Sequence, residues 1–451
     1  MSIIDIANVT RNSLLNYQSA LDATSRNIAN VNTQGYKRRR VDLTRYSMGF
    51  SRINGGLTIQ NVIRMRQRFV EDQLYMENER MGQYNMDEQI LSRVETVIGG
   101  TEENSLTDLF NEFWNGWEDL ANNPESQSQR TILRNRGVAI ANRFKRIHGD
   151  MKELKSQIRD EVSDTLREIN QDLTQLADLN KSIAMNPDND LLDQRDIVLE
   201  KLSELMEVDI TEKDNGTVTI STKGQILVSQ NSAYTLESQV ETSTDGYTQI
   251  KIYRSTGNRY LDIESGKLGS QLVNHNDRIN DYLADLNQLA TSFTSMVNSV
   301  HESGYDLDGN TGIPFFKTGI TGAGDIEVSS QILDDPSKIA SASAAGDPGN
   351  GAIAKAIADL RENNSMPGSV TLGEFYSILV GQVGQDVQNA TFLKTNQTKV
   401  IQSLRNQMES TSGVSIDEEM TNLIQFEQGY QAAAKMVNAV SDFAKTILNM
   451  V

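Results

Sequence analysis

The C-terminal end of the chain, residues 416–451, carries its longest regular pattern of apolar and polar positions. From Leu423 onward the apolar residues recur at alternating steps of three and four, which is the a/d spacing of a coiled coil. The apolar positions are Ile416, Leu423, Phe426, Tyr430, Ala433, Val437, Val440, Ala444, Ile447 and Val451. Because a long helix with one apolar stripe is not stable alone in water, the pattern predicts a helix that packs along its whole length against a partner.

The N-terminal end has a matching pattern. The same alternation runs through Ile3, Ala7, Thr10, Leu14, Tyr17, Leu21, Thr24, Ile28 and Val31. We therefore predict that the terminal helices pair as a coiled-coil stalk and that the rest of the chain is inserted between them. The polar Thr10 and Thr24 weaken this pairing, so both ends are expected to be largely disordered in the free subunit and to fold on assembly. Strong hydrogen-exchange protection of residues 3–31 and 416–451 in the monomer would contradict this expectation.

Helical spacing also dominates the interior. It predicts helices over residues 69–98, 105–121, 129–185, 190–206, 267–301 and 371–408. Apolar and polar residues alternate instead at 208–210, 217–220, 225–228 and 249–253, and Gly-containing turns separate these runs, which predicts a small antiparallel unit. Residues 57–63 look extended, residues 304–350 look rich in loops and partly β, and residues 36–56 receive no assignment.

These elements predict a mainly α fold with β-rich insertions and four units. A terminal coiled-coil assembly domain comprises residues 1–68 and 409–451. A long-helix bundle comprises residues 69–207, 264–305 and 385–408. A small β-hairpin insertion covers residues 208–263, and an outer loop-rich and β insertion covers residues 306–384.

Composition removes several classes of function. The formal net charge of −19 argues against general nucleic-acid binding. The chain has no cysteine, which excludes disulfides, cysteine metal ligands and thiol catalysis. No apolar run approaches the ~18 to 20 residues of a membrane span, and no cleavable leader is recognisable, so we expect no membrane insertion. Taken alone this indicates a cytoplasmic protein, and export with an uncleaved leader remains open.

One basic run, Lys37, Arg38, Arg39 and Arg40, stands out in this acidic chain. Such runs can bind nucleic acid, but this one has no interleaved aromatic residues. We expect it instead to meet acidic surfaces of neighbouring subunits. Replacing the run with Gln should then weaken a salt-sensitive assembly.

The sequence gives little support for a catalytic site or a metal site. Asp306 to Asn310 resembles the start of a calcium loop, but Thr311 and Lys317 stand where an EF-hand needs Gly and Glu, so a turn is predicted. The three histidines, His148, His275 and His301, lack metal-ligand spacing. There is no GxSxG, GxxxxGK[ST] or GxGxxG motif. We expect no enzyme activity, no catalytic residues, no metal and no cofactor.

Two tryptophans, Trp114 and Trp117, lie three residues apart on one predicted helix. A binding platform is one interpretation of this spacing. Core packing is the more common role of such a pair, and we predict it here.

The turn after the first helix, Asn27 to Arg38, resembles the signature of the bacterial flagellar axial proteins, the rod, hook and hook-associated proteins. Within it the residues that carry the resemblance are Asn27, Asn30, Thr33, Gly35 and Tyr36. Further stretches resemble the hook-associated protein 1 family, the first of the two hook–filament junction proteins. They are residues 119–124, 141–144, 189–196, 266–269, 304–310 and 412–419. Each stretch is short, but together they follow one another from end to end of the chain.

The resemblance implies a structural protein exported through the flagellar type III channel without a cleaved signal peptide. It implies self-association into a ring or helical layer, with hook protein below and the second junction protein or the filament above. In this family an export chaperone commonly covers the C-terminal helix, and the stripe from Leu423 to Val451 is a reasonable docking face for it. The chain is short for the family, so an outer domain of some relatives is reduced or missing here.

Two other interpretations remain open. One is a hook or rod protein of the same group, because the signature at Asn27 to Arg38 does not distinguish the members. The other is a cytosolic coiled-coil scaffold, because heptad patterns mark coiled coils in general. Finding the intact chain in the culture medium of cells that lack filaments would exclude the scaffold. Finding it only at the distal end of the hook would exclude the hook and rod proteins.

Overall fold

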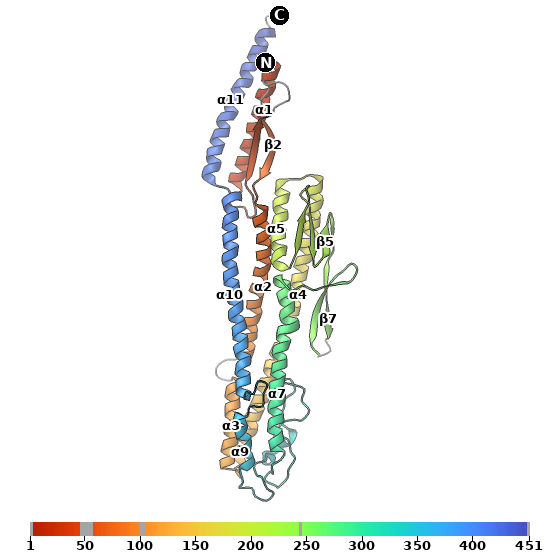
Figure 1. Cartoon of the computed structure of the whole chain (residues 1–451), viewed down its shortest axis with the longest axis vertical. Coiled ribbons are helices and arrows are strands. Elements are labelled where there is room, and N and C mark those ends of the chain that lie inside the picture. Colours follow the sequence, from red (N-terminus) through yellow and green to blue (C-terminus); the bar gives the residue numbers. More distant parts are fainter. Residues whose placement is uncertain (1–2, 46–56, 100–104, 243–245, 449–451) are drawn as a thin grey trace.

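The computed structural model describes residues 3–45, 57–99, 105–242 and 246–448 of an elongated molecule (Figure 1). Both chain ends lie at one tip, where α1 (Ile3–Ala29) and α11 (Ile416–Leu448) run side by side. An antiparallel hairpin of β1 (Arg39–Arg45) and β2 (Leu57–Arg64) packs on α1. The prediction that the two terminal helices pair is therefore confirmed.

Long helices form the body of the rod. They are α2 (Arg68–Gly99), α4 (Gln127–Met185), α5 (Asn189–Leu205), α6 (Gly266–Val273), α7 (Ile279–His301) and α10 (Leu372–Ser412). A single π-helical turn, η2 (Asn274–Arg278), joins α6 to α7. The N-terminus of α10 is capped because Glu374 N donates to Thr371 Oγ1 (3.2 Å) and Thr371 N donates to Glu374 Oε2 (2.8 Å). The apolar stripe of α4 is buried from Leu133 to Ile183, which makes this helix the spine of the hydrophobic core.

The end of the rod opposite the termini contains α3 (Leu106–Asn122), α9 (Ala352–Ala358) and an irregular segment that holds α8 (Ser330–Asp334), η3 (Pro336–Lys338) and η4 (Asp359–Glu362) (Figure 1). Aromatic rings fill its core. Phe113 lies 5.4 Å from Phe293 and 6.1 Å from Trp117, measured between ring centroids. Trp114 and Trp117 are both buried, as predicted from their spacing.

Two small antiparallel sheets lie beside α4 and α5 (Figure 1). One contains β3 (Asp209–Glu212), β4 (Val218–Thr222), β5 (Gln225–Ser229) and β6 (Ser232–Ala233) in sequence order. The other contains β7 (Leu236–Thr242), β8 (Thr248–Arg254) and β9 (Arg259–Leu261). The mainly α fold with β insertions is thus confirmed.

Some local expectations differ from the structure. The unassigned segment 36–56 contains β1, and β7 lies in a stretch where no strand was predicted. The expected unit boundary between residues 384 and 385 falls inside α10, which is continuous from Leu372 to Ser412. Residues 304–350 form isolated bridges, such as Phe316 with Val328, rather than ladders. None of the described helices is both long and apolar enough to cross a membrane.

Candidate assembly interface

The buried side chains of the two terminal helices are mainly small and polar among the described residues. On α1 the buried residues are Thr10, Asn16, Ala20, Ala23, Thr24 and Asn27. On α11 Ala433 and Glu419 are buried. The helices approach closely at Gly429, where an added Cβ would lie 2.5 Å from the ring of Tyr17. The large Tyr17 ring therefore occupies the space that the missing side chain of Gly429 leaves.

The large residues of the predicted seams are only partly covered. On α1 the half-buried members are Ala7, Leu14, Tyr17, Leu21 and Ile28, and Val31 in the turn after α1 is also half-buried. On α11 they are Leu423, Phe426, Tyr430 and Val440, whereas Val437 is exposed. The side chains of Ile3, Ile447 and Val451 lie outside the described residues. The two helices alone therefore leave the predicted a/d stripes only partly buried.

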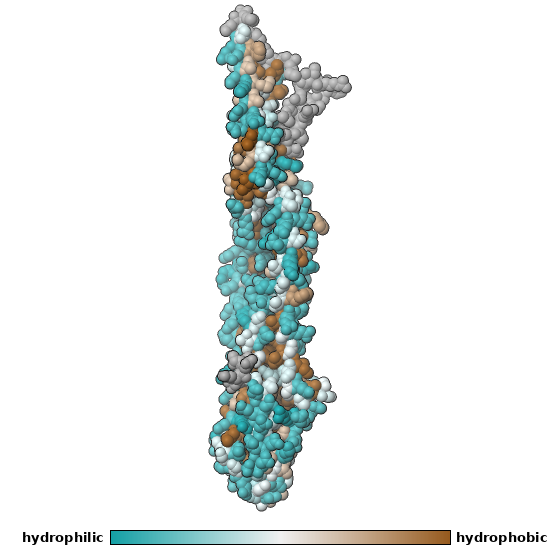
Figure 2. Space-filling model, turned by 90° about the vertical axis from the view of Figure 1, so that its left-hand side faces the viewer, coloured by the Kyte–Doolittle hydropathy of each residue, from teal (hydrophilic) through white to brown (hydrophobic). Residues whose placement is uncertain are grey.

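Other apolar side chains of α11 are exposed, and helical spacing places them on different sides of the helix. Ile416, Met420 and Ile424 lie on one side, Met436 and Phe443 lie on another, and Phe443 is 67% exposed. Figure 2 shows hydrophobic side chains gathered on the part of α11 near its junction with α10. Exposed apolar patches of this kind mark interaction surfaces in soluble proteins.

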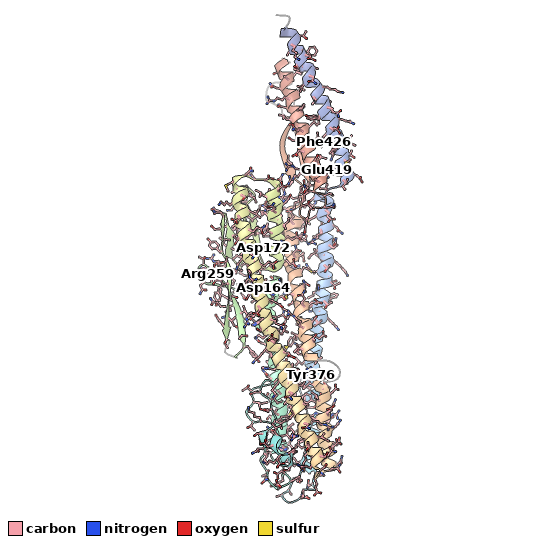
Figure 3. All side chains as sticks on the ribbon, turned by 180° about the vertical axis from the view of Figure 1, so that it is seen from behind. Asp164, Asp172, Arg259, Tyr376, Glu419 and Phe426 are labelled. Atoms are coloured by element: carbon pink, nitrogen blue, oxygen red, sulfur yellow. The ribbon has the colours of Figure 1, made fainter. Side chains whose placement is uncertain are left out.

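The turn after α1 connects both terminal helices to the body. The fully buried Asn27 donates through Nδ2 to Arg39 O (2.9 Å) and to Glu419 Oε2 (3.0 Å). Its Oδ1 accepts from Arg39 N and from Tyr36 Oη, both at 2.9 Å. All four hydrogen-bonding positions of this amide are thus used, on α1, the turn, β1 and the base of α11. Figure 3 labels Glu419 there, with Phe426 farther along α11.

Three other signature residues shape the same turn. Asn30 Nδ2 donates to Arg26 O (2.9 Å), and Thr33 Oγ1 donates to Asn30 Oδ1 (3.1 Å). Gly35 has φ +78°, and a Cβ there would lie 2.5 Å from Ile197 of α5. Both the backbone angle and the close approach therefore favour glycine at this position.

Three of the four residues of the basic run are paired within the subunit, and the expected contact of the run with neighbouring subunits stays a prediction. The buried Lys37 pairs with Glu71 of α2 and, at 2.8 Å, with Asp196 of α5. Arg38 pairs with Glu418 and Glu419 of α11, both at 2.8 Å. Arg39 is also buried and pairs with Asp190 and Asp193 of α5. These cations are paired within one subunit, so only the exposed Arg40 remains available to a neighbour.

A network of charges continues from the run, and we call it the charged joint; most of its members are buried, and Asp190 is exposed at its edge. Its members alternate in sign and come from five segments of the chain. They are Lys37, Arg39, Arg64, Arg66, Glu71, Asp190, Asp193, Arg195, Asp196 and Glu212. The joint therefore links the terminal hairpin to α2, α5 and β3 through charge-assisted bonds.

Asp196 lies at the centre of the charged joint. It contacts Arg64 (2.6 Å), Lys37 (2.8 Å) and Arg195 (2.6 Å). Burial alone would raise its pKa, but Lys37, Arg195 and Arg64 outweigh burial and hold the pKa of Asp196 well below its usual range. Asp193 differs, because burial raises its pKa in spite of Arg64, Arg39 and Lys37. Asp196 is therefore the carboxylate on which the joint depends.

Sequence reasoning missed the charged joint as a unit. The stretch Asn189 to Asp196 was noted for its resemblance, and a signal was present in it: Asp193, Arg195 and Asp196 occupy the buried face of a predicted helix. Charged residues at buried helix positions need partners, and the basic residues of the hairpin supply them. The pairing itself depends on tertiary structure.

The other candidate residues have structural roles. Asp306 Oδ1 accepts from Asp308 N (2.9 Å) and Asn310 N (2.7 Å), which makes the predicted turn. His301 is fully buried; its Nδ1 lies 2.7 Å from Ile313 O and its Nε2 accepts from Ala340 N (2.8 Å). Within the described ranges, no group of acidic residues and histidines is arranged to hold a metal ion.

Three family models match this chain. The flagellar hook-associated protein FlgK helical domain covers residues 91–316, half of the chain. The flagella basal body rod protein model covers residues 8–37, and the flagellar basal body rod FlgEFG protein C-terminal model covers residues 405–450. The two rod models thus match the terminal helices, while the larger model matches the body.

Curated relatives match from end to end. Flagellar hook-associated protein 1 of Bacillus subtilis is 28% identical over 97% of this chain and 96% of its own length. The protein of the same name from Salmonella typhimurium is 24% identical over 96% of this chain and 97% of its own. The second alignment runs over 540 positions, more than the 451 residues here, so that relative has insertions that this chain lacks.

A solved structure shares the fold. The flagellar hook junction protein FlgK from Burkholderia pseudomallei superposes with a TM-score of 0.69 at 16% sequence identity. The match covers 76% of this chain and all of that one. At this identity the likeness concerns the fold alone.

Proposed function

Because the chain belongs to the flagellar hook-associated protein 1 family, we propose that it is a structural subunit of the junction between flagellar hook and filament. The end-to-end match with curated relatives is the observation that carries this proposal. The subunit works by assembly and by transmitting force, not by catalysis. The FlgK helical-domain match over residues 91–316 favours a junction protein over a rod or hook protein, because the rod models match only the ends.

The terminal helices are the assembly domain of this proposal. Their mutual contact leaves the large seam residues half-covered and leaves further apolar side chains of α11 exposed, such as Ile424 and Phe443. Neighbouring copies that pack against these side chains would complete the burial. Contacts between different faces of identical subunits build open helical or ring arrays, which suits a layer between hook and filament. The expectation that these helices become ordered only on assembly follows the same reasoning.

The charged joint has a mechanical role in this proposal. The assembly domain would bear mechanical force from both sides. Hook protein would lie on one side, and the second junction protein or the filament on the other. Buried ion pairs from β1, α2 and α5 would pass that load to the body, because their geometry is specific and breaking them exposes uncompensated charge. The outer units, residues 208–263 and the loop-rich segment after α7, would face away from the tube axis.

Export would precede assembly. The chain has no cysteine and would pass unfolded through the flagellar type III channel without oxidative refolding afterwards. A chaperone that covers the stripe of α11 from Leu423 to Val451 would keep subunits apart in the cytoplasm, as helix-in-groove partners do.

The deciding experiment locates an epitope-tagged full-length chain in its own cells by immunogold electron microscopy. We expect label only at the distal end of the hook, and intact chain in the medium of cells that cannot build filaments. A variant that ends at Ser412 lacks α11 and should be absent from the junction while its body remains folded. A surface variant such as Arg167→Gln should assemble normally, because it removes only the exposed ion pair with Asp164 within α4.

Other locations would overturn the proposal. Label along the hook or in the rod would identify a hook or rod protein. Retention of the whole chain in the cytoplasm of exporting cells would indicate a coiled-coil scaffold. Assembly of the variant that ends at Ser412 would remove α11 from its organising role.

A further inference from the structure

One face of α10 is exposed and nearly free of charge. Ile378, Phe392 and Val400 are 56%, 63% and 40% exposed. At about 100° per residue, these three side chains lie within an arc of roughly 80° around the helix axis. Together with the exposed Gly381, Gln385, Asn389 and Ser403 they form a face that we call the ridge. Lys399, at the edge of the ridge, is the one charged residue among the exposed positions from Ile378 to Ser403.

The ridge differs in composition from the exposed surface of α4. Over residues 152–168 the exposed side chains of α4 are mostly charged, and they are Lys152, Glu153, Gln157, Arg159, Asp160, Ser163, Asp164, Arg167 and Glu168. A charged face of this kind is typical of a helix that meets water. The buried centre of a protein interface is instead depleted of charged residues and enriched in aromatic ones. In a chain with a net charge of −19, the ridge therefore has the composition of an interface.

A groove with similar chemistry lies on the other side of the rod. It runs along α4 from Ser163 to Ser182, is bordered by α5 and the start of β7, and has a volume of about 1070 Å³. Leucines form part of its surface, and most of its other residues carry amide or hydroxyl groups. They include Leu166, Leu179, Leu191, Asn170, Gln171, Thr174, Gln175 and Gln194. Because α10 packs on α2 and β7 packs on α4, the ridge and the groove lie on opposite sides of the subunit (Figure 1).

The groove and the ridge carry charges of opposite sign. The groove contains two carboxylates, Asp178 and Glu237, and neither is ion-paired within the described part of the subunit. The cation in the groove, Arg167, is paired with Asp164 of the same helix. Lys399 of the ridge likewise has no ion pair with any described residue. The ridge can therefore supply a cation where the groove has an excess of negative charge.

The directions of the two helices place these groups level with one another. α4 and α10 both run toward the tip that holds the chain ends, since α4 leads to α5 beside β1 and α10 leads to α11 (Figure 1). In a neighbouring copy of the same polarity, Lys399 can thus lie level with Asp178. Phe392 and Gln171 each precede these residues by seven positions, so they also lie level with one another, near the middle of the groove.

We propose that the ridge of one subunit packs into the groove of a neighbouring copy that has the same polarity. This inference rests on the assembly proposed above and adds a contact between the bodies of the subunits. Phe392 lies against the leucines of the groove, and Lys399 pairs with Asp178. Because ridge and groove are different faces on opposite sides, each copy binds two neighbours, and the contact continues around a ring or helical layer.

The test cross-links cysteines placed in the ridge and in the groove. The chain has no cysteine of its own, so Asn389→Cys and Gln171→Cys together provide the only thiols. Both positions are exposed, and they belong to opposite sides of the subunit, so a short bismaleimide joins them only between copies. Cells that make the full-length double variant are treated with the reagent, and their hook fraction and remaining fractions are run on denaturing gels. We expect a ladder of dimers, trimers and longer oligomers.

The matched control moves one cysteine off the ridge. Gln402→Cys, exposed on another side of α10, replaces Asn389→Cys and should give no ladder. The inference is overturned if no fraction contains a ladder, or if Asn389→Cys alone gives dimers, because ridges then meet each other. A ladder only in fractions without hooks would support the contact and overturn the junction assignment. Hooks that hold the protein without a ladder would support the assignment and overturn the contact.

A charge in the ridge should break the contact without unfolding the subunit. Phe392→Asp, made in the double-cysteine variant, adds a carboxylate to a groove that already holds two, so the ladder should weaken roughly tenfold. Ile132→Asp makes the same change at an exposed position of α4 outside the groove and should leave the ladder unchanged. Since Phe392 is exposed within the subunit, we expect unchanged melting of Phe392→Asp. A ladder of equal strength from Phe392→Asp would contradict the proposed contact.

Discussion

The end of the rod that holds α3 and the tip that holds α1 and α11 differ in what stabilises them. In the first, the rings of Phe113, Phe293 and Trp117 contact one another and are buried. In the second, Leu14 and Phe426 are half-covered, and Phe443 is exposed. One region is complete as a folded core, whereas the other leaves apolar surface uncovered within the subunit.

The charged joint lies between these regions and belongs fully to neither. Its ion pairs are buried, so they are specific in geometry but sensitive to the loss of one partner. A subunit built this way can keep a folded body before its terminal helices contact other subunits. Changes made in each region should therefore have separable effects on folding and on assembly.

The largest expected effect is in the aromatic core. Phe113→Ala should lower the free energy of unfolding by about 4 kcal/mol, because it leaves a cavity among packed rings. Phe443→Ala, the matched change on α11, should alter monomer stability by less than about 0.5 kcal/mol because the side chain is exposed. Urea unfolding of both variants measures this difference. Comparable losses would show that the tip is as fully packed as the core.

The next largest effect is at the charged joint. Asp196→Asn should cost about 3 kcal/mol, because Lys37 and Arg64 lose the charge that compensates them. Asp164→Asn, in an exposed pair with Arg167, should cost less than about 1 kcal/mol. Because the folded pKa of Asp196 is depressed, its contribution is complete above its ordinary pKa and is lost as pH falls below about 4. Equal stability of the two variants at pH 7 would contradict the central place given to Asp196.

These regions also differ in how much of their structure the sequence predicts. Helix positions follow from apolar spacing, and the pairing of the termini follows from two matching stripes. Burial of Lys37 and Asp196 does not follow, because charged residues are usually exposed and only tertiary structure shows their partners. β1 is not predicted either, because its basic residues interrupt the pattern of apolar and polar positions that indicates a strand.

A smaller effect is expected from acid at the aromatic end. Burial lowers the pKa of His301 to about 4, with Arg130 adding to the effect and Ile313 O and Asp306 opposing it. As the pH falls below about 6.5, His301 takes up a proton in the unfolded chain but not in the folded chain. The contribution of His301 to the free energy of unfolding is therefore full above that pH and falls toward pH 4. Between pH 7.5 and 5 the loss from this residue should be about 2 kcal/mol. His301→Asn should show a smaller pH dependence in urea unfolding, and an unchanged dependence would mean that His301 does not sense acid.

The smallest effect on monomer stability is expected at Gly429, where it separates folding from assembly. Gly429→Ala gains helix propensity of about 1 kcal/mol but places a methyl group against Tyr17, so the net change in unfolding free energy should be near zero. Gly381→Ala on α10 has open space around the new Cβ and should stabilise by about 0.5 to 1 kcal/mol. Incorporation at the junction should fail for Gly429→Ala and persist for Gly381→Ala, because only the first moves α11 away from α1. Normal incorporation of both would show that assembly does not require this close approach of the terminal helices.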